Sequence, residues 1–301
     1  YHMGNVILFT RNYRDAKQFY NLIQELQALA MEHNGKPLLI AIDQEGGSVV
    51  RMMHDATWFP GPMAMRVAGE PDLAYRLGQA VGREMAAYGL NLNLAPVVNM
   101  ATNPNSPHAG ARCFGADPES CAPWAISYIR GVQESVYATA KHYPGIGNSK
   151  VDLHLALGSN DRPLEELEKV ELSPARVAVA AKVSTVMTSH EIYSAIDDQP
   201  CTLSHKLLND YLRGKYGFEG TVISDCMQMG ALSRTIPTPI ACVQAVQAGV
   251  DLLLVCHTRQ VQIDSTMALA EAVEKVTLDQ VVDAACQVKL DSIYTLRGKE
   301  G

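Results

Sequence analysis

The sequence predicts an α/β fold built on a parallel sheet, either a (β/α)8 barrel or a doubly wound sheet. Three observations lead to this prediction. Short apolar runs alternate with longer amphipathic segments along the whole chain. Most of these runs lack polar/apolar alternation, which is typical of strands buried on both faces. The length of 301 residues also suits one α/β barrel, and we expect residues 1–301 to form a single domain.

Seven apolar runs are the candidate strands. They span residues 4–9, 37–43, 92–98, 137–143, 183–190, 220–225 and 250–255. Strands that alternate with helices pair in parallel, with right-handed crossovers. A doubly wound sheet accepts seven strands whereas a closed barrel needs eight, so the count alone leaves both folds open.

Helical patterns fill the segments between these runs. Segment 16–33 places its large apolar side chains on one face, as expected of a helix that packs on a sheet. Segments 73–89 and 245–251 contain Gly89 and Gly249, each at a position typical of a helix C-cap. Further helices are expected over 163–181, 204–217 and 278–296.

Composition limits the class of protein. Hydrophobic residues make up 47% and charged residues 19% of the chain, as in a globular domain with a large core. The net charge is −7 and no basic stripe occurs, which argues against nucleic-acid binding. No run of about 18 apolar residues occurs, so we expect no membrane span.

The seven cysteines are scattered and contain no CxxC pair. This pattern predicts buried free thiols rather than a disulfide framework or a structural zinc site. Free thiols favour the cytoplasm. A secreted or lipid-anchored protein stays open because the native N-terminus is not visible in this sequence.

Charged side chains follow several predicted strands at their carboxyl ends, where the active site of a (β/α)8 barrel forms. A single aspartate there often caps the next helix, but several together indicate a catalytic rim. Converging carboxylates also suit a metal ion, so a metal-dependent hydrolase stays open. The candidate metal ligands are Asp43, Glu45, His190 and Asp225.

One loop, KHYPGIGNSKVDLH at 141–154, brings together the ionisable side chains of Lys141, His142, Asp152 and His154. On an extended loop Asp152 and His154 point the same way. The carboxylate then fixes the imidazole tautomer and leaves the other ring nitrogen to transfer protons near neutral pH. Glycine and proline in this loop favour its movement over the site.

Five motifs occur in one order: AIDQEGGSVVR (41–51), ARCFGADPE (111–119), AKHYPGIGNSKVDLH (140–154), VMTSHEIYSAID (186–197) and GTVISDCMQMGAL (220–232). Together they resemble the β-N-acetylglucosaminidases of glycoside hydrolase family 3, the type that acts in peptidoglycan recycling and cell-wall metabolism. The resemblance covers nearly the whole chain. The Lys-His-x-Pro-Gly loop followed by Asp-x-His separates this branch from the β-glucosidases. The resemblance implies a (β/α)8 barrel whose first strand lies upstream of residue 1.

The resemblance also implies a role for each matched position. Asp225 corresponds to the nucleophile, His154 to the mobile acid/base and Asp152 to its partner. The residues that correspond to those holding N-acetylglucosamine are Asp43, Arg112, Lys141 and His142. The implied reaction removes terminal β-linked N-acetylglucosamine from peptidoglycan fragments or chitooligosaccharides with retention, through a covalent glycosyl-enzyme. It requires no metal and no organic cofactor.

Three positions depart from the family pattern. Ile146 replaces a histidine of the loop, Leu153 replaces a serine, and Ser48 replaces an arginine. We expect the first two to alter loop motion and Ser48 to alter contacts beyond the first sugar. A phosphorylase or transglycosylase on the same scaffold stays open, because a histidine acid/base repels phosphate less than a carboxylate does. A non-catalytic sugar-binding barrel is a further alternative, and the natural aglycone and the oligomeric state are not predicted.

Overall fold

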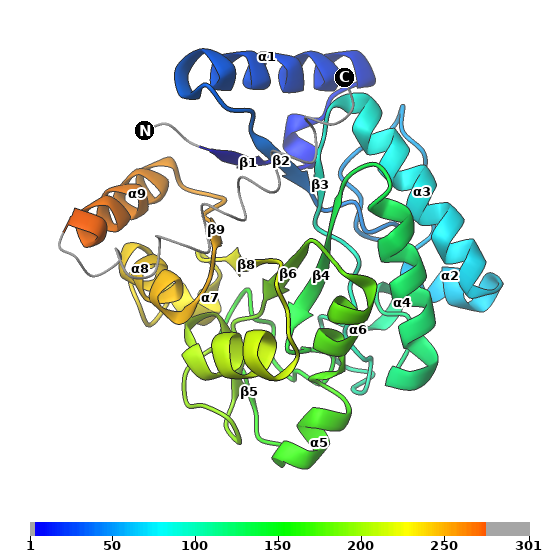
Figure 1. Ribbon diagram of the computed structural model, residues 1–301, viewed down its shortest axis with the longest axis vertical. Coiled ribbons are helices and arrows are strands. Elements are labelled where there is room, and N and C mark those ends of the chain that lie inside the picture. Colours follow the sequence, from blue (N-terminus) through cyan, green and yellow to red (C-terminus); the bar gives the residue numbers. More distant parts are fainter. Residues whose placement is uncertain (1–3, 275–301) are drawn as a thin grey trace.

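The computed structural model of the protein describes residues 4–274, and a parallel seven-stranded sheet forms its centre (Figure 1). The strands pair in the order β1-β2-β3-β4-β6-β8-β9, with helices around the outside. Because this order follows the sequence without reversal, the sheet is a nearly closed barrel and the doubly wound alternative is wrong. The strand bounds are β1 Asn5–Ile7, β2 Leu39–Ile42, β3 Leu92–Asn93, β4 Tyr137–Tyr143, β6 Thr185–Thr188, β8 Thr221–Cys226 and β9 Leu252–Leu254.

The helices lie between the strands, as predicted. Helix α1 begins after Asp15, whose carboxylate accepts a hydrogen bond from the Gln18 backbone N–H at 2.8 Å. Helix α8 ends at Gly249, whose φ of 114° suits glycine at the predicted C-cap. The helix bounds are α1 Ala16–Asn34, α2 Pro62–Ala68, α3 Pro71–Tyr88, α4 Pro118–Val132, α5 Leu164–Lys169, α6 Ser173–Ala181, α7 Gly230–Ser233, α8 Thr238–Ala248 and α9 Arg259–Glu274, with a π-helix at Lys206–Lys215 and 3-10 turns at Thr10–Asn12, Gly110–Arg112 and Cys201–Leu203. The helix predicted at 278–296 lies outside the described residues.

The single helix predicted at 163–181 is wrong, because the segment forms two helices, α5 and α6. Pro174 explains the break between them. In a continuous helix the proline ring would collide with the carbonyl four residues earlier, that of Val170. Val170 follows directly on the last residue of α5, and Pro174 occupies the first turn of α6, where proline is tolerated.

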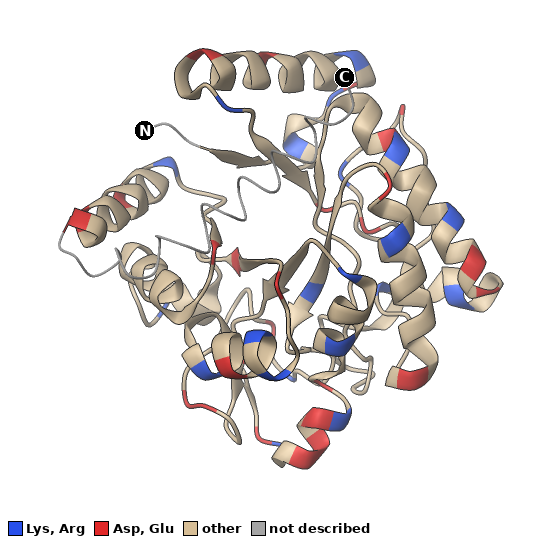
Figure 2. Ribbon diagram, in the orientation of Figure 1, with Lys and Arg blue, Asp and Glu red and all other residues tan. Residues whose placement is uncertain are grey.

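The outer helices carry Lys and Arg interspersed with Asp and Glu (Figure 2). Every residue of β2 and β6 is buried, whereas β1 and β9 are partly exposed. This burial confirms strands covered on both faces for the inner runs but not for the two edge strands. The six cysteines within residues 4–274 are buried free thiols, as predicted, and Cys286 lies outside this range. In the same range no helix combines the length and the apolar character that crossing a bilayer requires.

Strands β1 and β9 are the edges of the sheet. A cavity of about 560 Å³ lies between them; its apolar lining comes mainly from α1, β1, β2, β3 and β9, whereas α9 contributes mostly polar side chains. An eighth strand that completed the barrel would pair at this position. The strand expected upstream of residue 1 stays a prediction, as does the single-domain organisation of residues 1–301.

A second, two-stranded sheet pairs β5 (Ser159–Asn160) with β7 (Ile192–Tyr193). It follows the loop 144–158, which leads out of β4. The hydroxyl of Tyr193 lies 3.1 Å from the carbonyl oxygen of Gly145 and 3.3 Å from Oε2 of Glu191. A hydrogen bond from Tyr193 of β7 therefore holds the start of the loop against the small sheet that follows its end.

Glu191 is a buried carboxyl at this junction. Burial, together with the charges of Glu171 and Asp161, raises the pKa of Glu191 to about 7. Hydrogen bonds from Ser149 and Tyr193 act in the opposite direction but do not offset the burial. The side chain therefore changes charge near neutral pH, underneath the loop that carries Asp152 and His154.

We predict that Glu191→Gln stabilises the protein more at high pH than at low pH. Below the ordinary pKa of 4.5 the wild-type carboxyl is protonated in both the folded and the unfolded chain. As the pH rises, the unfolded chain loses its proton first, so the wild type loses roughly 3 kcal/mol of folding free energy by the time the folded carboxyl ionises. Glutamine stays neutral and avoids this loss.

Urea unfolding at about pH 5 and about pH 8 measures the effect. Glu219→Gln, at an exposed glutamate, is the matched control. A stability difference between Glu191→Gln and the wild type that stayed the same at both pH values would contradict the prediction.

Candidate active site

The ammonium group of Lys141, in β4, lies between two carboxylates that follow β2. Its Nζ is 2.8 Å from Oδ1 of Asp43 and 2.7 Å from Oε1 of Glu45. Burial disfavours the charged form of Lys141, but the two carboxylates outweigh it and raise the pKa of Lys141 above its ordinary value. The side chain is therefore a fixed positive charge at the carboxyl end of the sheet.

Two arginines complete this ion cluster. Arg112 donates to both carboxylate oxygens of Glu45, from Nε at 2.9 Å and from Nη2 at 2.8 Å. Arg51 donates from Nη2 to Oδ2 of Asp43 at 3.0 Å. Burial opposes ionisation of Asp43 and Glu45, but the surrounding cations lower the pKa of both carboxyls. The two carboxylates therefore stay ionised.

Glu45 was not among the predicted sugar-binding residues, although it holds two of them, Lys141 and Arg112. It comes two residues after Asp43 in the segment that leaves β2. Side chains two apart point the same way in an extended segment, so this spacing is the signal that could have identified it.

Asn99 fixes the orientation of His142. Its Oδ1 accepts the backbone N–H of His142 at 3.0 Å, so its Nδ2 is the atom that donates to His142 Nδ1 at 3.3 Å. The imidazole proton is then on Nε2, which lies 3.8 Å from Oδ2 of Asp225. Burial, together with Lys141 and Arg112, holds the pKa of His142 well below its ordinary value. A neutral imidazole N–H therefore faces the carboxylate of Asp225.

Asp225, near the end of β8, presents one fixed and one open carboxylate oxygen. The backbone N–H of Cys226 donates to Oδ1 at 2.7 Å. Oδ2 faces His142, and the side chain keeps 22% of its surface exposed. The arrangement suits a nucleophile, because the carboxylate is oriented but remains accessible to a ligand.

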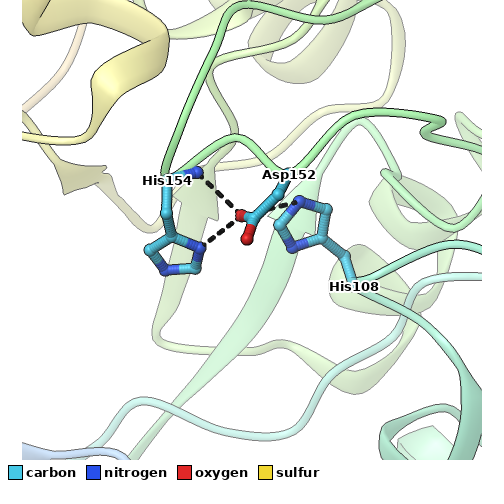
Figure 3. A group of neighbouring side chains, drawn as sticks. All are labelled: His108, Asp152 and His154. Atoms are coloured by element: carbon cyan, nitrogen blue, oxygen red, sulfur yellow. Dashed lines mark hydrogen bonds and ion pairs between the residues drawn. The ribbon is translucent and has the colours of Figure 1, made fainter.

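Asp152 and His154 are hydrogen-bonded, as predicted (Figure 3). Nδ1 of His154 lies 2.8 Å from Oδ1 of Asp152, and the His154 backbone N–H donates to the same oxygen at 2.9 Å. The expected extended backbone is wrong, because the carbonyl of Asp152 accepts hydrogen bonds from Leu155 and Ala156 in a turn. An aspartate that bonds the N–H two residues later stabilises such a turn, and the turn itself pairs the two side chains.

The acid/base candidate His154 is accessible. Its side chain is 66% exposed and that of Asp152 is 39% exposed, whereas Lys141 is 2% exposed. Partial burial opposes ionisation of Asp152, but the hydrogen bonds from His154 lower the pKa of Asp152 below its ordinary value. The carboxylate therefore holds the Nδ1 side of the ring, and Nε2 stays available to a substrate.

The turn after Asp225 binds the acid/base loop through its backbone. Gly230 donates to the carbonyl of His154 at 2.9 Å, and Ala231 donates to the carbonyl of Leu153 at 3.0 Å. A Cβ at position 230 would lie 2.6 Å from the His154 carbonyl oxygen, so this approach requires glycine. The candidate nucleophile Asp225 and the acid/base candidate His154 therefore belong to two directly bonded segments.

Two of the three departures from the family pattern are packing residues. Ile146 and Leu153 are buried in one apolar cluster with Cys226, Met229, Ala231 and Cys256. The cluster fills the space between the acid/base loop and the turn after Asp225. Ser48 is exposed.

His108 supports the acid/base turn and was not predicted as a site residue. The backbone N–H of Leu153 donates to Nε2 of His108 at 3.1 Å. The ring centroids of His108 and His154 lie 5.9 Å apart (Figure 3). Burial lowers the pKa of His108, so the ring accepts this hydrogen bond in its neutral form. Because His108 lies far from the loop in sequence, no spacing rule connects the two.

The predicted set of metal ligands does not converge. Arg51, Arg112 and Lys141 neutralise Asp43 and Glu45. His190 uses both ring nitrogens elsewhere, on the hydroxyl of Thr202 at 2.8 Å and the carbonyl of Cys226 at 3.0 Å.

One other group in the described part of the chain places three potential ligand atoms within 4.8 Å of one another, namely His108, Asp152 and His154. A metal ion there would compete with the hydrogen bond from Leu153 to His108 and with the Asp152–His154 pair.

Comparison with known proteins gives one family. Residues 1–290 match the N terminal domain of glycosyl hydrolase family 3. A beta-hexosaminidase of Tolumonas auensis is 37% identical over 261 residues, which cover 85% of this chain and 76% of that protein.

Solved structures agree with this match. A glycoside hydrolase family 3 beta-N-acetylglucosaminidase from a Paenibacillus species has a TM-score of 0.96 and 38% identity, and the match covers 100% of this chain and 58% of that one. A beta-glucoside phosphorylase has a TM-score of 0.87 and 26% identity, covering 100% of this chain and 55% of that one. The chain therefore spans little more than half the length of these two solved relatives. With its barrel, its five motifs and these matches, the chain belongs to glycosyl hydrolase family 3.

Proposed function

We propose that the chain is a retaining exo-β-N-acetylglucosaminidase that removes terminal β-linked N-acetylglucosamine. The observation that carries the proposal is the hydrogen-bonded Asp152–His154 pair on a loop whose backbone is bonded to the turn after Asp225. This arrangement supplies a carboxylate nucleophile and a separate proton-transfer group, the two functions that retaining glycoside hydrolysis needs.

In the first step the Asp225 carboxylate attacks the anomeric carbon. The bond to the glycosidic oxygen breaks, and the His154 imidazolium gives its Nε2 proton to that oxygen, so the aglycone leaves as an alcohol. Asp152 keeps the Nδ1 proton in place and stabilises the imidazolium before the transfer. The product of this step is a glycosyl ester on Asp225.

In the second step neutral His154 takes a proton from water through Nε2. The water oxygen attacks the anomeric carbon, and the ester bond to Asp225 breaks. The sugar leaves with its original configuration, because two inversions have occurred. Retaining enzymes usually use a second carboxyl for proton transfer, and it needs a raised pKa to stay protonated at neutral pH. A histidine titrates there with little adjustment.

The predicted sugar-binding residues divide into two layers by exposure. The side chains of Arg112 and Asp43 are 22% and 14% exposed, so we place them in contact with the sugar. Lys141 lies beneath them and binds both Asp43 itself and Glu45, the carboxylate partner of Arg112. The Nε2–H of His142, beside Asp225, would donate to a sugar oxygen near the reacting carbon.

We propose peptidoglycan fragments or chitooligosaccharides as substrates. The support comes from the sequence motifs and from the Paenibacillus relative, which is named a beta-N-acetylglucosaminidase. A cytoplasmic location stays a prediction from the free thiols.

Transfer of the sugar to phosphate is the second candidate. It is supported by the likeness to a beta-glucoside phosphorylase. A histidine acid/base also repels phosphate less than a carboxylate in the same position would. Release of sugar 1-phosphate in phosphate buffer would favour this candidate over hydrolysis.

We predict that Asp225→Asn abolishes release of nitrophenol from nitrophenyl β-N-acetylglucosaminide, by at least about a thousandfold. An amide cannot form the glycosyl ester. The wild type should act on this substrate and not on the β-glucoside, and both are measured with and without phosphate. Asp264→Asn, at an exposed aspartate of α9, is the matched control. Undiminished activity of Asp225→Asn would place the nucleophile elsewhere.

We predict that His154→Ala slows cleavage of an unactivated substrate more than that of an activated one. Chitobiose needs its leaving oxygen protonated, so its kcat/KM should fall by about a hundredfold to a thousandfold. Nitrophenolate leaves without a proton, so its release should fall by only about tenfold in the burst phase. His205→Ala, at an exposed histidine, controls for the substitution. Equal losses on both substrates would remove His154 from the role of acid.

We predict that Arg112→Lys raises KM for the N-acetylglucosaminide by about tenfold while kcat falls less. Lysine cannot reproduce the two parallel hydrogen bonds to Glu45 that orient the guanidinium. The matched control is Arg66→Lys, because Arg66 donates to the carbonyl of Phe114 rather than to a carboxylate. A loss confined to kcat would show instead that Arg112 acts in the chemical step.

A further inference from the structure

Two cysteines lie together behind the candidate nucleophile. Cys226 ends β8 directly after Asp225, and Cys256 follows the neighbouring strand β9. Both belong to the apolar cluster beneath the acid/base loop, and their thiols interact through a side-chain hydrogen bond. The mechanism derived above uses neither thiol.

These two thiols differ from the other buried cysteines in access to solvent. Cys226 is 8% exposed and Cys256 is 6% exposed. By contrast, four other cysteines are 0% exposed, namely Cys113, Cys121, Cys201 and Cys242. Cys256 lines the cavity between β1 and β9, as does the fully buried Cys242. Because Cys226 and Cys256 alone among the cysteines of residues 4–274 keep solvent-exposed surface, a small oxidant reaches this pair more readily than the other four thiols of that range.

The backbone of Cys226 holds the groups of the active site in place. Its N–H donates to Oδ1 of Asp225 at 2.7 Å, and its carbonyl accepts from Nε2 of His190 at 3.0 Å. The carbonyl of Cys256 accepts from Nη2 of Arg11 at 3.2 Å. A new covalent bond between the two side chains would pull on the backbone that orients the Asp225 carboxylate, because disulfides tolerate only a narrow geometry.

We propose that Cys226 and Cys256 are a redox modification site, in which a hydroperoxide joins the two thiols into a disulfide and so lowers the activity of the adjacent Asp225. The consequence for activity rests on the proposed function, whereas formation of the disulfide does not. This thiol pair would make the proposed hydrolase activity reversibly sensitive to peroxide.

The chemistry balances as a two-electron oxidation. The Cys226 thiolate attacks one oxygen of the peroxide, the O–O bond breaks, and Cys226 becomes a sulfenic acid while hydroxide leaves. The Cys256 sulfur then attacks the sulfenic sulfur, the S–O bond breaks, and water leaves with the Cys256 proton. The peroxide is reduced and the two thiols are oxidised.

The local electrostatics favour Cys226 as the first thiol to react. The hydrogen bond from Cys256 lowers the pKa of Cys226 although burial opposes it, and the same bond raises the pKa of Cys256. The charge of Asp225 acts against the Cys226 thiolate. One thiol is thus activated while its neighbour stays protonated and resolves the sulfenic acid.

The test treats the reduced protein with hydrogen peroxide, blocks the remaining thiols and measures the intact mass and the linked peptides. Relative to the reduced protein blocked in the same way, we expect two fewer blocking groups, a loss of about 2 Da for the two hydrogens removed, and a Cys226–Cys256 linked peptide. We also expect activity on nitrophenyl β-N-acetylglucosaminide to fall by about tenfold and to return with dithiothreitol. Cys256→Ser should keep its basal activity and form no disulfide. Cys242→Ser, at a fully buried cysteine, should behave as the wild type.

Three outcomes would overturn the proposal. The first is a peroxide-treated wild type without the linked peptide. The second is a linked peptide whose formation leaves activity unchanged. The third is loss of the reversible inhibition in Cys242→Ser but not in Cys256→Ser. If the untreated protein had no glycosidase activity, the linked peptide would still report on the thiol pair independently of the proposed function.

Discussion

The carboxyl end of this barrel depends on the buried ammonium of Lys141. The residue lies in β4, yet its two carboxylate partners follow β2, so one side chain ties together two strands that have β3 between them. Removing one member of such a buried cluster leaves its partners uncompensated, which costs about 3–5 kcal/mol. With Arg51 and Arg112 the cluster has three cations against two carboxylates, a surplus of one positive charge. Under the proposed function, that surplus would favour the oxygen atoms of a sugar as hydrogen-bond acceptors.

The connection out of β4 joins two environments within a few residues. Lys141 and His142 are buried and held by ion pairs and by Asn99, whereas Asp152 and His154 are exposed. A group that fixes a sugar benefits from a rigid, dry setting, where electrostatic interactions are strong. A group that both gives and takes a proton must reach the leaving oxygen and then a water molecule. The change from strand to turn along this segment meets both requirements.

The sequence predicted the parts of this site that follow simple periodicity. The fourth apolar run has the same bounds as β4, and the charged residues at the strand ends do gather at the carboxyl end of the sheet. Position along a strand fixes where a side chain points, so such residues are predictable. The role of His108 was not predictable, because it depends on a contact with Leu153, which lies 45 residues away in sequence. The turn at Asp152 was not predictable either, because a local side-chain hydrogen bond to the His154 backbone competes there with an extended backbone. The break between α5 and α6 was predictable in principle from Pro174 alone.

The geometry between the candidate nucleophile and the acid/base candidate is set locally rather than by the barrel as a whole. Gly230 and Ala231 bind the carbonyls of His154 and Leu153, and the apolar contacts of Ile146 and Leu153 fill the space beneath. A polar side chain at position 153 would lose this burial and would need a hydrogen-bond partner among apolar neighbours. The two departures from the family pattern therefore act in the same direction, because both strengthen the contact between the loop and the turn after Asp225. A loop held in this way opens less readily, so movement of His154 costs more here than in a loop with polar residues at these positions.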